Sequence, residues 1–289
     1  MTEKLAELTC KDCKETYTPA SAGFLGITIR MDGGRCSKCK MEALKAWEAE
    51  EAALKAQEIA AQRLKWRRGS GIPVKFLTAE FGTWDKDRPG NVDYAYKKCL
   101  KYAEGFPICY FKEIIEKEKP AYPSLMLMSP WVDAAQPGNG VGKTHLVAAI
   151  ANNIFNRWKG ETAICPVKFI TEGDLFNSIQ ATFGYSAEDR KRKPSLTRII
   201  EILTYIPLLI IDDIGKEQRK NVEFVQSQLF ALINARYNAD RPVILTTNLN
   251  TIALGAHLEG DAEAITDRLI EMCGKDYFIE MTGESYRRR

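Results

Sequence analysis

The sequence predicts an α/β fold in which a parallel sheet is flanked by helices, preceded by a small four-cysteine module and a helical linker. Three observations lead to this prediction. Two Cys-x₂-Cys pairs lie near the N-terminus, a run rich in Ala, Glu, Lys and Gln follows, and apolar runs then alternate with helical patterns. We therefore expect three parts: a module at residues 1–42, a linker at 43–68 and an α/β domain at 69–289.

The bulk composition fits a cytoplasmic globular protein. At 289 residues and 45% hydrophobic the chain can bury a full core, and its net charge of +3 does not by itself require a nucleic-acid partner. No apolar run reaches the length that spans a bilayer, and the N-terminus lacks an apolar signal core. We expect no membrane association. In the cytoplasm, the eight cysteines indicate reduced thiols or metal ligands rather than disulfides.

Four of the cysteines form the two pairs, Cys10 with Cys13 and Cys36 with Cys39. Each pair places two thiolates close enough to share one tetrahedral Zn²⁺, and two pairs complete its coordination. Such a zinc would be structural, because all four ligands come from the protein. The alternatives are redox dithiols or unrelated free cysteines. The remaining cysteines are expected to be packed or half-exposed thiols: Cys99, Cys109, Cys165 and Cys273.

The linker consists mostly of strong helix formers from Met41 to about Arg68. Its apolar residues keep no strict heptad, so the composition predicts a long, mostly solvated helix rather than a coiled coil. Gly69-Ser70-Gly71 and then Pro73 end it.

Beyond Gly71, strands and helices alternate. The expected core strands are Leu125–Ser129, Val167–Thr171, Leu208–Ile211 and Val243–Thr246. The expected helices are Lys143–Lys159, Gly173–Phe183, Leu196–Leu203, Val222–Ala239 and Ala262–Cys273.

A glycine-rich loop between the first of these strands and the first helix predicts a phosphate-binding site. Glycines allow backbone N–H groups to form a concave nest, and the following helix adds its positive N-terminus. Lys143 would reach the β- and γ-phosphates of ATP, and the Thr144 hydroxyl would bind Mg²⁺. The expected nucleotide-binding residues are Gly138, Asn139, Gly140, Val141, Gly142, Lys143, Thr144 and His145. A glycine-rich loop before an ordinary helix is the alternative, which the flanking strand and helix disfavour.

Two carboxylates and an amide follow other core strands. Asp212 would hold Mg²⁺, and Asp213 would orient or deprotonate the attacking water. Asn248 would sit between the strand that bears the aspartates and the strand that bears the phosphate loop, where it could position the water. The alternatives are turn aspartates that cap the next segment and a turn-favouring asparagine.

Aromatic residues precede a basic run, a combination suited to single-stranded DNA. The proposed DNA-binding residues are Phe183, Tyr185, Arg190, Lys191, Arg192 and Lys193, with Phe176 as a further aromatic and the Arg287–Arg289 tail as a possible phosphate contact. The alternative is that the aromatics belong to the core and the charges form a solvated loop.

An ordered set of motifs from about Gly69 to the C-terminus resembles the DnaC/DnaI-type replicative helicase loaders, a branch of the AAA+ ATPases that also includes the IstB transposition helpers. The motifs are Ser70-Gly71-Ile72-Pro73 with Phe76, the phosphate loop with His145-Leu146, Asp212-Asp213-Ile214-Gly215, Thr246-Thr247-Asn248, Asp267-Arg268-Leu269 and Ser285-Tyr286-Arg287. The cysteine module is similar to that of DnaI-type loaders.

The resemblance implies an AAA+ P-loop NTPase fold and an ATPase whose sites lie between subunits of a homo-oligomer. It implies that Arg268 is an arginine finger that reaches a neighbouring subunit's ATP, and that Asn248 is the first sensor. Two features depart from the family pattern. Pro137 replaces the first glycine of the loop, after an insertion at Pro130–Gln136. Asp213 stands where many relatives carry Glu, so we expect slow hydrolysis that depends on assembly and DNA.

The leading hypothesis is an ATP-dependent loader that acts in the primosome and binds single-stranded DNA and a hexameric replicative helicase, with the zinc module docking on the helicase. The alternatives are an IstB-like transposition helper and a nucleotide-switched DNA-binding adaptor with little turnover. A small-molecule kinase would need a substrate lid and further phosphate-gripping arginines, which the sequence does not display.

Overall fold

The computed structural model describes residues 7–18, 21–24, 27–30, 33–109, 121–131, 138–159, 164–215, 222–258 and 262–286. The chain divides into two compact units, Met1–Gln62 and Arg63–Arg289. Pro137, residues 132–136 of the expected insertion and the Arg287–Arg289 tail lie outside the described residues.

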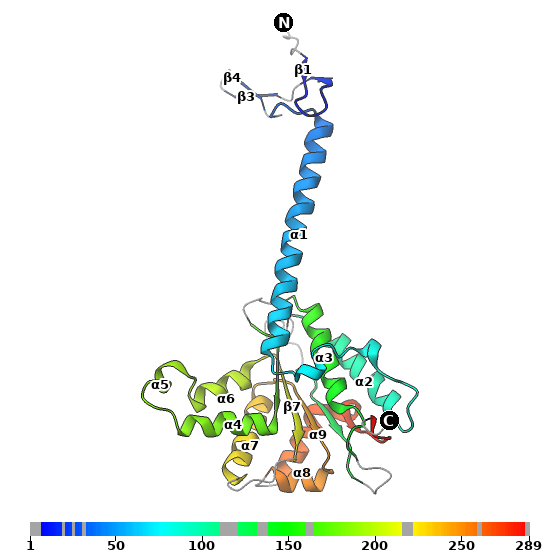
Figure 1. The fold of residues 1–289 in the computed structure, drawn as a ribbon, viewed down its shortest axis with the longest axis vertical. Helices are drawn as coiled ribbons and strands as arrows, with labels where there is room; N and C mark the ends of the chain where they lie inside the picture. Colours follow the sequence, from blue (N-terminus) through cyan, green and yellow to red (C-terminus); the bar gives the residue numbers. More distant parts are fainter. Residues whose placement is uncertain are drawn as a thin grey trace. The chain divides into compact units, whose positions relative to one another are not determined.

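The first unit contains two short antiparallel hairpins and most of a long helix (Figure 1). Its elements are β1 (Leu8–Thr9), β2 (Thr16–Tyr17), β3 (Ser21–Phe24), β4 (Ile27–Arg30) and α1 (Ser37–Gly69). β1 pairs with β2, and β3 pairs with β4. Most side chains of α1 are exposed, as expected of a solvated helix made from strong helix formers.

The second unit contains a five-stranded sheet in the order β6-β7-β8-β5-β9, and every neighbouring pair is parallel. The strands are β5 (Leu125–Met128), β6 (Val167–Thr171), β7 (Leu208–Ile214), β8 (Val243–Thr247) and β9 (Phe278–Glu280). The expected parallel α/β fold is confirmed, and all four expected strands are present. β9 was not expected, because a three-residue strand that directly follows a helix has no period of its own.

Two hydrophobic cores lie on opposite faces of the sheet, because successive strand residues point to opposite sides. Leu125 and Leu127 of β5 belong to the first core, whereas Met126 and Met128 belong to the second. The helices are therefore divided between the two faces, with α2 and α3 in the first core and α4, α6, α7, α8 and α9 in the second. Parallel strands that are buried on both sides account for the continuous apolar runs in the sequence.

The helices of the second unit are α2 (Val92–Gly105), α3 (Lys143–Arg157), α4 (Glu172–Phe183), α5 (Asp189–Arg192), α6 (Leu196–Tyr205), α7 (Val222–Asn238), α8 (Thr251–His257) and α9 (Ala262–Tyr277). Two 3₁₀ turns precede them, at Val74–Phe76 and Phe81–Thr83. The five expected helices are present, while α2 and the short α5 and α8 were not expected. Within the described part of the chain, no helix has both the length and the apolar character needed to cross a membrane.

Arg236 on α7 is fully buried and joins two elements of the second core. Its Nη1 donates to the carbonyl oxygens of Leu203 at 2.6 Å, Thr204 at 3.0 Å and Ile206 at 3.1 Å, which close the C-terminus of α6. Its Nη2 donates to the carbonyl oxygen of Pro242, just before β8, at 2.5 Å. One guanidinium thus satisfies carbonyls that the end of a helix leaves unpaired.

Candidate nucleotide and metal sites

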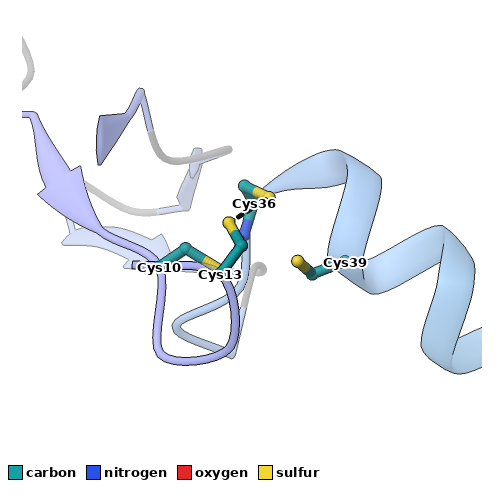
Figure 2. Close-up of side chains that lie close together, drawn as sticks. All are labelled: Cys10, Cys13, Cys36 and Cys39. Atoms are coloured by element: carbon teal, nitrogen blue, oxygen red, sulfur yellow. Dashed lines mark hydrogen bonds between the residues drawn. The ribbon is translucent and has the colours of Figure 1, made fainter. Parts of the chain in front are cut away.

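The four paired cysteines converge in the first unit, and their Sγ atoms all lie within 4.8 Å of one another (Figure 2). Cys10 and Cys13 lie on the turn after β1, whereas Cys36 precedes α1 and Cys39 lies in its first turn. The Sγ atoms of Cys13 and Cys36 are 3.7 Å apart. Four thiolates about 2.3 Å from a tetrahedral Zn²⁺ would be separated by about 3.8 Å, so the cluster fits a zinc ion.

The surroundings of the cluster also favour thiolate chemistry at one position. The backbone N–H of Cys36 donates to Sγ of Cys10 at 3.3 Å, and this hydrogen bond helps lower the pKa of Cys10 to about 6. Burial raises the pKa of Cys39 to about 12, so that thiol needs a cation to ionise at neutral pH. The other cysteines are dispersed as expected: Cys99 and Cys273 are buried, and Cys109 and Cys165 are half-buried.

The glycine-rich loop connects β5 to α3 in a conformation that requires glycine. Gly140 and Gly142 have φ angles of +82° and +109°, in the left-handed region that side chains disfavour. A Cβ at Gly140 would collide with Oγ of Ser285, and one at Gly142 with the ring of Trp84. Gly142 is the N-cap of α3, so the loop leads directly to the positive end of that helix.

Lys143 is the first residue of α3 and is 6% exposed. Its Nζ donates to Oδ1 of Asn248 at 2.6 Å, to the carbonyl oxygen of Gly138 at 3.4 Å and to Oγ of Ser129. Asn248 in turn donates from Nδ2 to Oδ1 of Asn139 at 2.8 Å. Since β8 lies between β5 and β7, the structure places Asn248 where the sequence predicted, beside the phosphate loop.

Asp212 lies in the C-terminal half of β7 and is 2% exposed. Its Oδ2 accepts a hydrogen bond from Oγ1 of Thr144 at 2.9 Å, and its Oδ1 accepts one from Oγ1 of Thr246 at 2.5 Å. Burial raises the pKa of Asp212, and the two hydroxyls only partly oppose this effect. The Thr144 hydroxyl and the Asp212 carboxylate are oxygen ligands of the kind that Mg²⁺ prefers, so the pair fits a magnesium site.

Asp213 follows in a distorted part of the strand. The register of β7 against β8 shifts between Ile211 and Ile214, and Asp213 has a φ angle of +60°. Its backbone N–H donates to Oγ1 of Thr246 at 2.9 Å. Such strain in a residue other than glycine is a recurrent property of functional sites. Because of this shift, the two neighbouring carboxylates lie in different places. The Asp212 carboxylate lies beside Thr144, and Asp213 faces the pocket described next.

A pocket of about 330 Å³ lies over the phosphate loop. It brings together five residues predicted to act on nucleotide: Lys143, Thr144, His145, Asp213 and Asn248. Asn139, Gly140 and Gly142 also line it, whereas Gly138 and Val141 do not. The pocket also includes residues from the segment before the sheet that sequence reasoning did not assign to the site: Lys75, Phe76, Thr78, Ala79, Thr83, Trp84, Asp85 and Arg88, and Tyr286 joins them from the C-terminal segment.

These further residues form an aromatic wall around His145. The His145 ring lies 5.5 Å from the Trp84 ring and 6.3 Å from the Phe76 ring. The Arg88 guanidinium lies 4.3 Å above the Trp84 ring. Burial lowers the pKa of His145, which favours the neutral ring at physiological pH. A planar base fits such a wall, because aromatic faces stack on it. Only the aromatic content of residues 76–84 could have indicated this wall.

The C-terminal segment closes the pocket from another side. The backbone N–H of Tyr286 donates to the carbonyl oxygen of Gly140 at 3.0 Å. The segment is tied to the turn before α2 by Asn91, whose Nδ2 donates to the carbonyl oxygen of Glu280 at 2.7 Å and whose Oδ1 accepts from the backbone N–H of Thr282 at 2.8 Å. The segment before α2 and the C-terminal segment, which flank the phosphate loop on two sides, are thus joined to each other by the side-chain hydrogen bonds of Asn91.

The proposed DNA-binding segment is mostly exposed. Phe183 is 61% exposed and packs edge-on against Phe224 at 5.5 Å, and Lys193 lies 5.4 Å above the Tyr185 ring. The basic run Arg190–Lys193 lies on and just after α5. Arg192 and Lys193 pair with Glu188 and Asp189 at 3.0 and 2.9 Å, so their charge is partly offset within the segment. Phe176 is buried in the second core, in agreement with the core alternative for that residue.

Arg268 on α9 is half-buried and does not line the pocket of its own chain. Its guanidinium lies 5.9 Å from the centre of the Tyr237 ring, whose hydroxyl donates to Oε2 of Glu271 at 3.0 Å. The structure therefore does not bring Arg268 to the phosphate loop of the same subunit.

Together, the parallel sheet, the phosphate loop and the carboxylates define a P-loop nucleotide-binding domain. Residues 134–289 match the family of IstB-like ATP binding proteins, and the chain belongs to this family, within the AAA+ ATPases. The chain is 24% identical over 253 residues to the replicative helicase loader DnaC of Escherichia coli K12, covering 86% of this chain and 87% of DnaC. It is also 26% identical to the uncharacterized protein YqaM of Bacillus subtilis, covering 74% of this chain and 58% of YqaM.

Two solved structures also align with parts of this chain. The crystal structure of DnaI aligns with a TM-score of 0.49 at 20% identity, covering 73% of this chain and 95% of that one. A crystal structure of the DnaC helicase loader aligns with a TM-score of 0.49 at 19% identity, covering 70% of this chain and 97% of that one.

Proposed function

We propose that this protein is an ATP-dependent helicase loader in DNA replication. One observation carries the proposal: Lys143, Asp213 and Asn248, predicted from three separate motifs, line a single pocket, in a chain whose similarity to DnaC extends over 86% of its length. ATP would act mainly as a switch between a state that holds the helicase and a state that releases it.

In this function, the backbone N–H groups of the phosphate loop and the ammonium of Lys143 bind the triphosphate. Thr144 and Asp212 would hold Mg²⁺, which neutralises phosphate charge when it is bound with the nucleotide. Asp213 orients and deprotonates the attacking water, and Asn248 positions it from the neighbouring strand. The wall of Phe76, Trp84 and His145 accommodates the base.

Arg268 acts in trans in this proposal. Its place on α9, away from the pocket of its own chain, supports a role at the ATP site of a neighbouring subunit in a homo-oligomer. Hydrolysis is then limited by assembly, and also by Asp213, whose side chain is one methylene shorter than the glutamate of many relatives. We propose slow turnover that rises with oligomerisation and DNA.

The two remaining interactions belong to other parts of the chain. A zinc module at residues 1–42, joined by the linker at 43–68 to the ATPase domain at 69–289, docks on the hexameric replicative helicase. Single-stranded DNA contacts Phe183, Tyr185 and the basic run Arg190–Lys193, where exposed aromatics lie beside exposed cations.

Helicase binding tests the proposal directly. Full-length protein is mixed with the replicative helicase of the same cell, and complex formation is measured by gel filtration with ATP, with ADP and without nucleotide. We expect a stable complex with ATP that weakens with ADP, and loss of this nucleotide dependence in Lys143→Ala. No complex under any condition would contradict the loader function.

The family match over residues 134–289 favours a second candidate, an IstB-like helper that prepares target DNA for a transposase. That role gives no part to a cysteine module that docks on a helicase. A complex with a transposase instead of the helicase would therefore support this candidate. A third candidate, a nucleotide-switched adaptor with little turnover, is tested through Asp213 in the Discussion.

A further inference from the structure

A fully buried carboxylate lies outside the nucleotide pocket and contacts the turn that carries Asp213. Glu172 is the first residue of α4 and has 0% exposure. Its Oε2 accepts a hydrogen bond from the backbone N–H of Gly215 at 2.8 Å. Its Oε1 lies 2.6 Å from Nε2 of His257, the last residue of α8. Neither Glu172 nor His257 lines the pocket.

The start of α4 does not account for this carboxylate. Thr171 already caps the helix, because its Oγ1 accepts a hydrogen bond from the backbone N–H of Asp174 at 3.0 Å. Burying a carboxylate costs free energy unless hydrogen bonds and an opposite charge compensate it. Both carboxylate oxygens of Glu172 contact other elements, namely the turn after β7 and the end of α8. We therefore look for its role in the connection between these two elements.

One of these contacts fastens the strained turn after β7. Asp213 and Gly215 both have left-handed φ angles, of +60° and +86°. Two hydrogen bonds from β8 hold the turn on one side: the Asp213 N–H donates to Oγ1 of Thr246, and Oγ1 of Thr247 donates to the carbonyl oxygen of Ile214 at 2.8 Å. On its other side, towards β6 and α4, the turn is held by the hydrogen bond from the Gly215 amide to Glu172.

The second contact extends to the strand that carries Asn248. α8 begins three residues after Asn248 and is capped by Asn250, whose Oδ1 accepts from the backbone N–H of Ala253 at 2.8 Å. At the other end of α8, Nδ1 of His257 lies 3.4 Å from Nε2 of Gln226 on α7. The Glu172–His257 pair thus connects the turn of Asp213 to the helix that follows Asn248.

We propose that Glu172 and His257 are positioning residues, which hold the Asp213 turn in register with Asn248 for attack of water on ATP. The inference rests on the proposed function, in which Asp213 acts on that water. Glu172 acts through the Gly215 amide, and His257 acts by holding Glu172. Nucleotide affinity depends instead on the phosphate loop, which neither residue contacts among the described interactions.

The kinetic test separates turnover from binding. In Glu172→Ala we expect kcat for ATP to fall by about 10- to 100-fold, since a displacement of about 1 Å at a reacting group costs about 100-fold. KM, and the Kd of a non-hydrolysable ATP analogue, should change less than about threefold, as expected for a group that acts after binding. Glu172→Gln keeps an oxygen for the Gly215 amide and should recover most of kcat, while His257→Phe should lie between the two.

A matched control removes an ion pair remote from the pocket. Lys98 pairs with Asp276 at 2.6 Å with 20% of its side chain exposed, and neither residue lines the pocket. Lys98→Met should leave kcat within about twofold of wild type, the expectation for a distant and independent site. An equal fall of kcat in Lys98→Met and Glu172→Ala, or a fall in nucleotide affinity as large as that in kcat, overturns the positioning role.

Hydrogen exchange of the backbone amides at 208–215 gives a readout that needs no catalysis. In the nucleotide-free protein, Glu172→Ala should accelerate exchange at the Gly215 amide while β7 amides within the sheet keep their protection. Unchanged exchange overturns the inference. If wild type hydrolyses ATP no faster than Asp213→Asn, the ATPase function fails, and the exchange result still decides whether Glu172 holds the turn.

Discussion

Asp213 combines a backbone in the left-handed region with a side chain that lines the pocket, so it is the first residue to test. Asp213→Asn keeps the size of the side chain but removes the base. We expect ATP hydrolysis to fall by about 100-fold or more, the usual range for loss of a general base, while the Kd of an ATP analogue stays nearly unchanged. Steady-state ATPase rates with and without single-stranded DNA provide the measurement.

The same variant discriminates the nucleotide-switched adaptor from the ATPase. If wild type and Asp213→Asn hydrolyse ATP at the same near-background rate under every condition, including helicase and DNA, the adaptor is favoured. Asp85→Asn is a suitable control, since Asp85 also lines the pocket but lies on the segment before the sheet.

We predict that the ionised Asp212 carboxylate lowers the stability of the metal-free folded protein. Burial raises its pKa in the folded protein, so the folded state binds the proton more tightly than the unfolded chain does. The stabilisation from this proton is complete below the unfolded pKa and is lost as pH rises through the folded pKa. Near neutral pH the ionised carboxylate is therefore unfavourable in the metal-free protein.

Asp212→Asn should accordingly raise the melting temperature of the metal-free protein near pH 7.5, by roughly 2–4 °C, the shift that about 1 kcal/mol produces in a chain of this size. The gain should shrink as pH is lowered, and Mg²⁺-dependent ATP hydrolysis should be lost. Thermal unfolding followed at several pH values in EDTA measures this effect. A stability gain that grows toward acid pH would contradict the assignment.

At the scale of elements, Arg236 on α7 joins the end of α6 to the start of β8. Its substitution tests how much these connections stabilise the second core. Arg236→Met fills similar space but leaves buried carbonyl oxygens of Leu203 and Pro242 without their donor. Each unsatisfied buried group costs about 1–3 kcal/mol, so we expect a loss of at least about 3 kcal/mol in the free energy of unfolding. Urea unfolding followed by circular dichroism measures the loss.

Arg198→Met is the matched control for this substitution. Arg198 lies on α6 and pairs with Glu201 at 2.8 Å, with 60% of its side chain exposed. Removing such an exposed pair should cost less than about 1 kcal/mol. Equal losses for the two arginines would show that Arg236 does not hold the elements together.

How far the sequence predicts these elements depends on the range of the interactions. The strand Leu208–Ile211 and the loop that ends in Lys143 could be predicted because apolar runs and glycine spacing are local patterns. β9 was missed, since three residues after a helix carry no period of their own. α2 was also missed, although its buried residues, such as Val92, Ala95 and Cys99, recur at helical spacing and could have predicted it. The Trp84 wall and the Glu172–His257 pair were missed because they unite residues far apart in the chain, which a linear pattern does not encode.

At the scale of the whole molecule, the four-cysteine cluster and the nucleotide pocket belong to two different compact units. The Sγ atoms of the cluster lie within 4.8 Å of one another in the first unit, and the nucleotide pocket belongs to the second. Because a structural zinc supplies folding free energy to the module that binds it, its removal should affect helicase docking but not ATP binding.

Cys39→Ser tests this separation. Cys39 is 7% exposed, and burial raises the pKa of its thiol to about 12, so without a metal that thiol stays protonated and contributes no charge. Wild type purified without chelator should contain about one zinc per chain, the stoichiometry of a four-thiolate site, and Cys39→Ser should contain far less. The variant should keep the wild-type Kd for an ATP analogue and lose the ATP-dependent complex with the helicase. A parallel loss of analogue binding would mean that the cysteine cluster supports the nucleotide pocket, and would contradict the division of labour proposed for the two units.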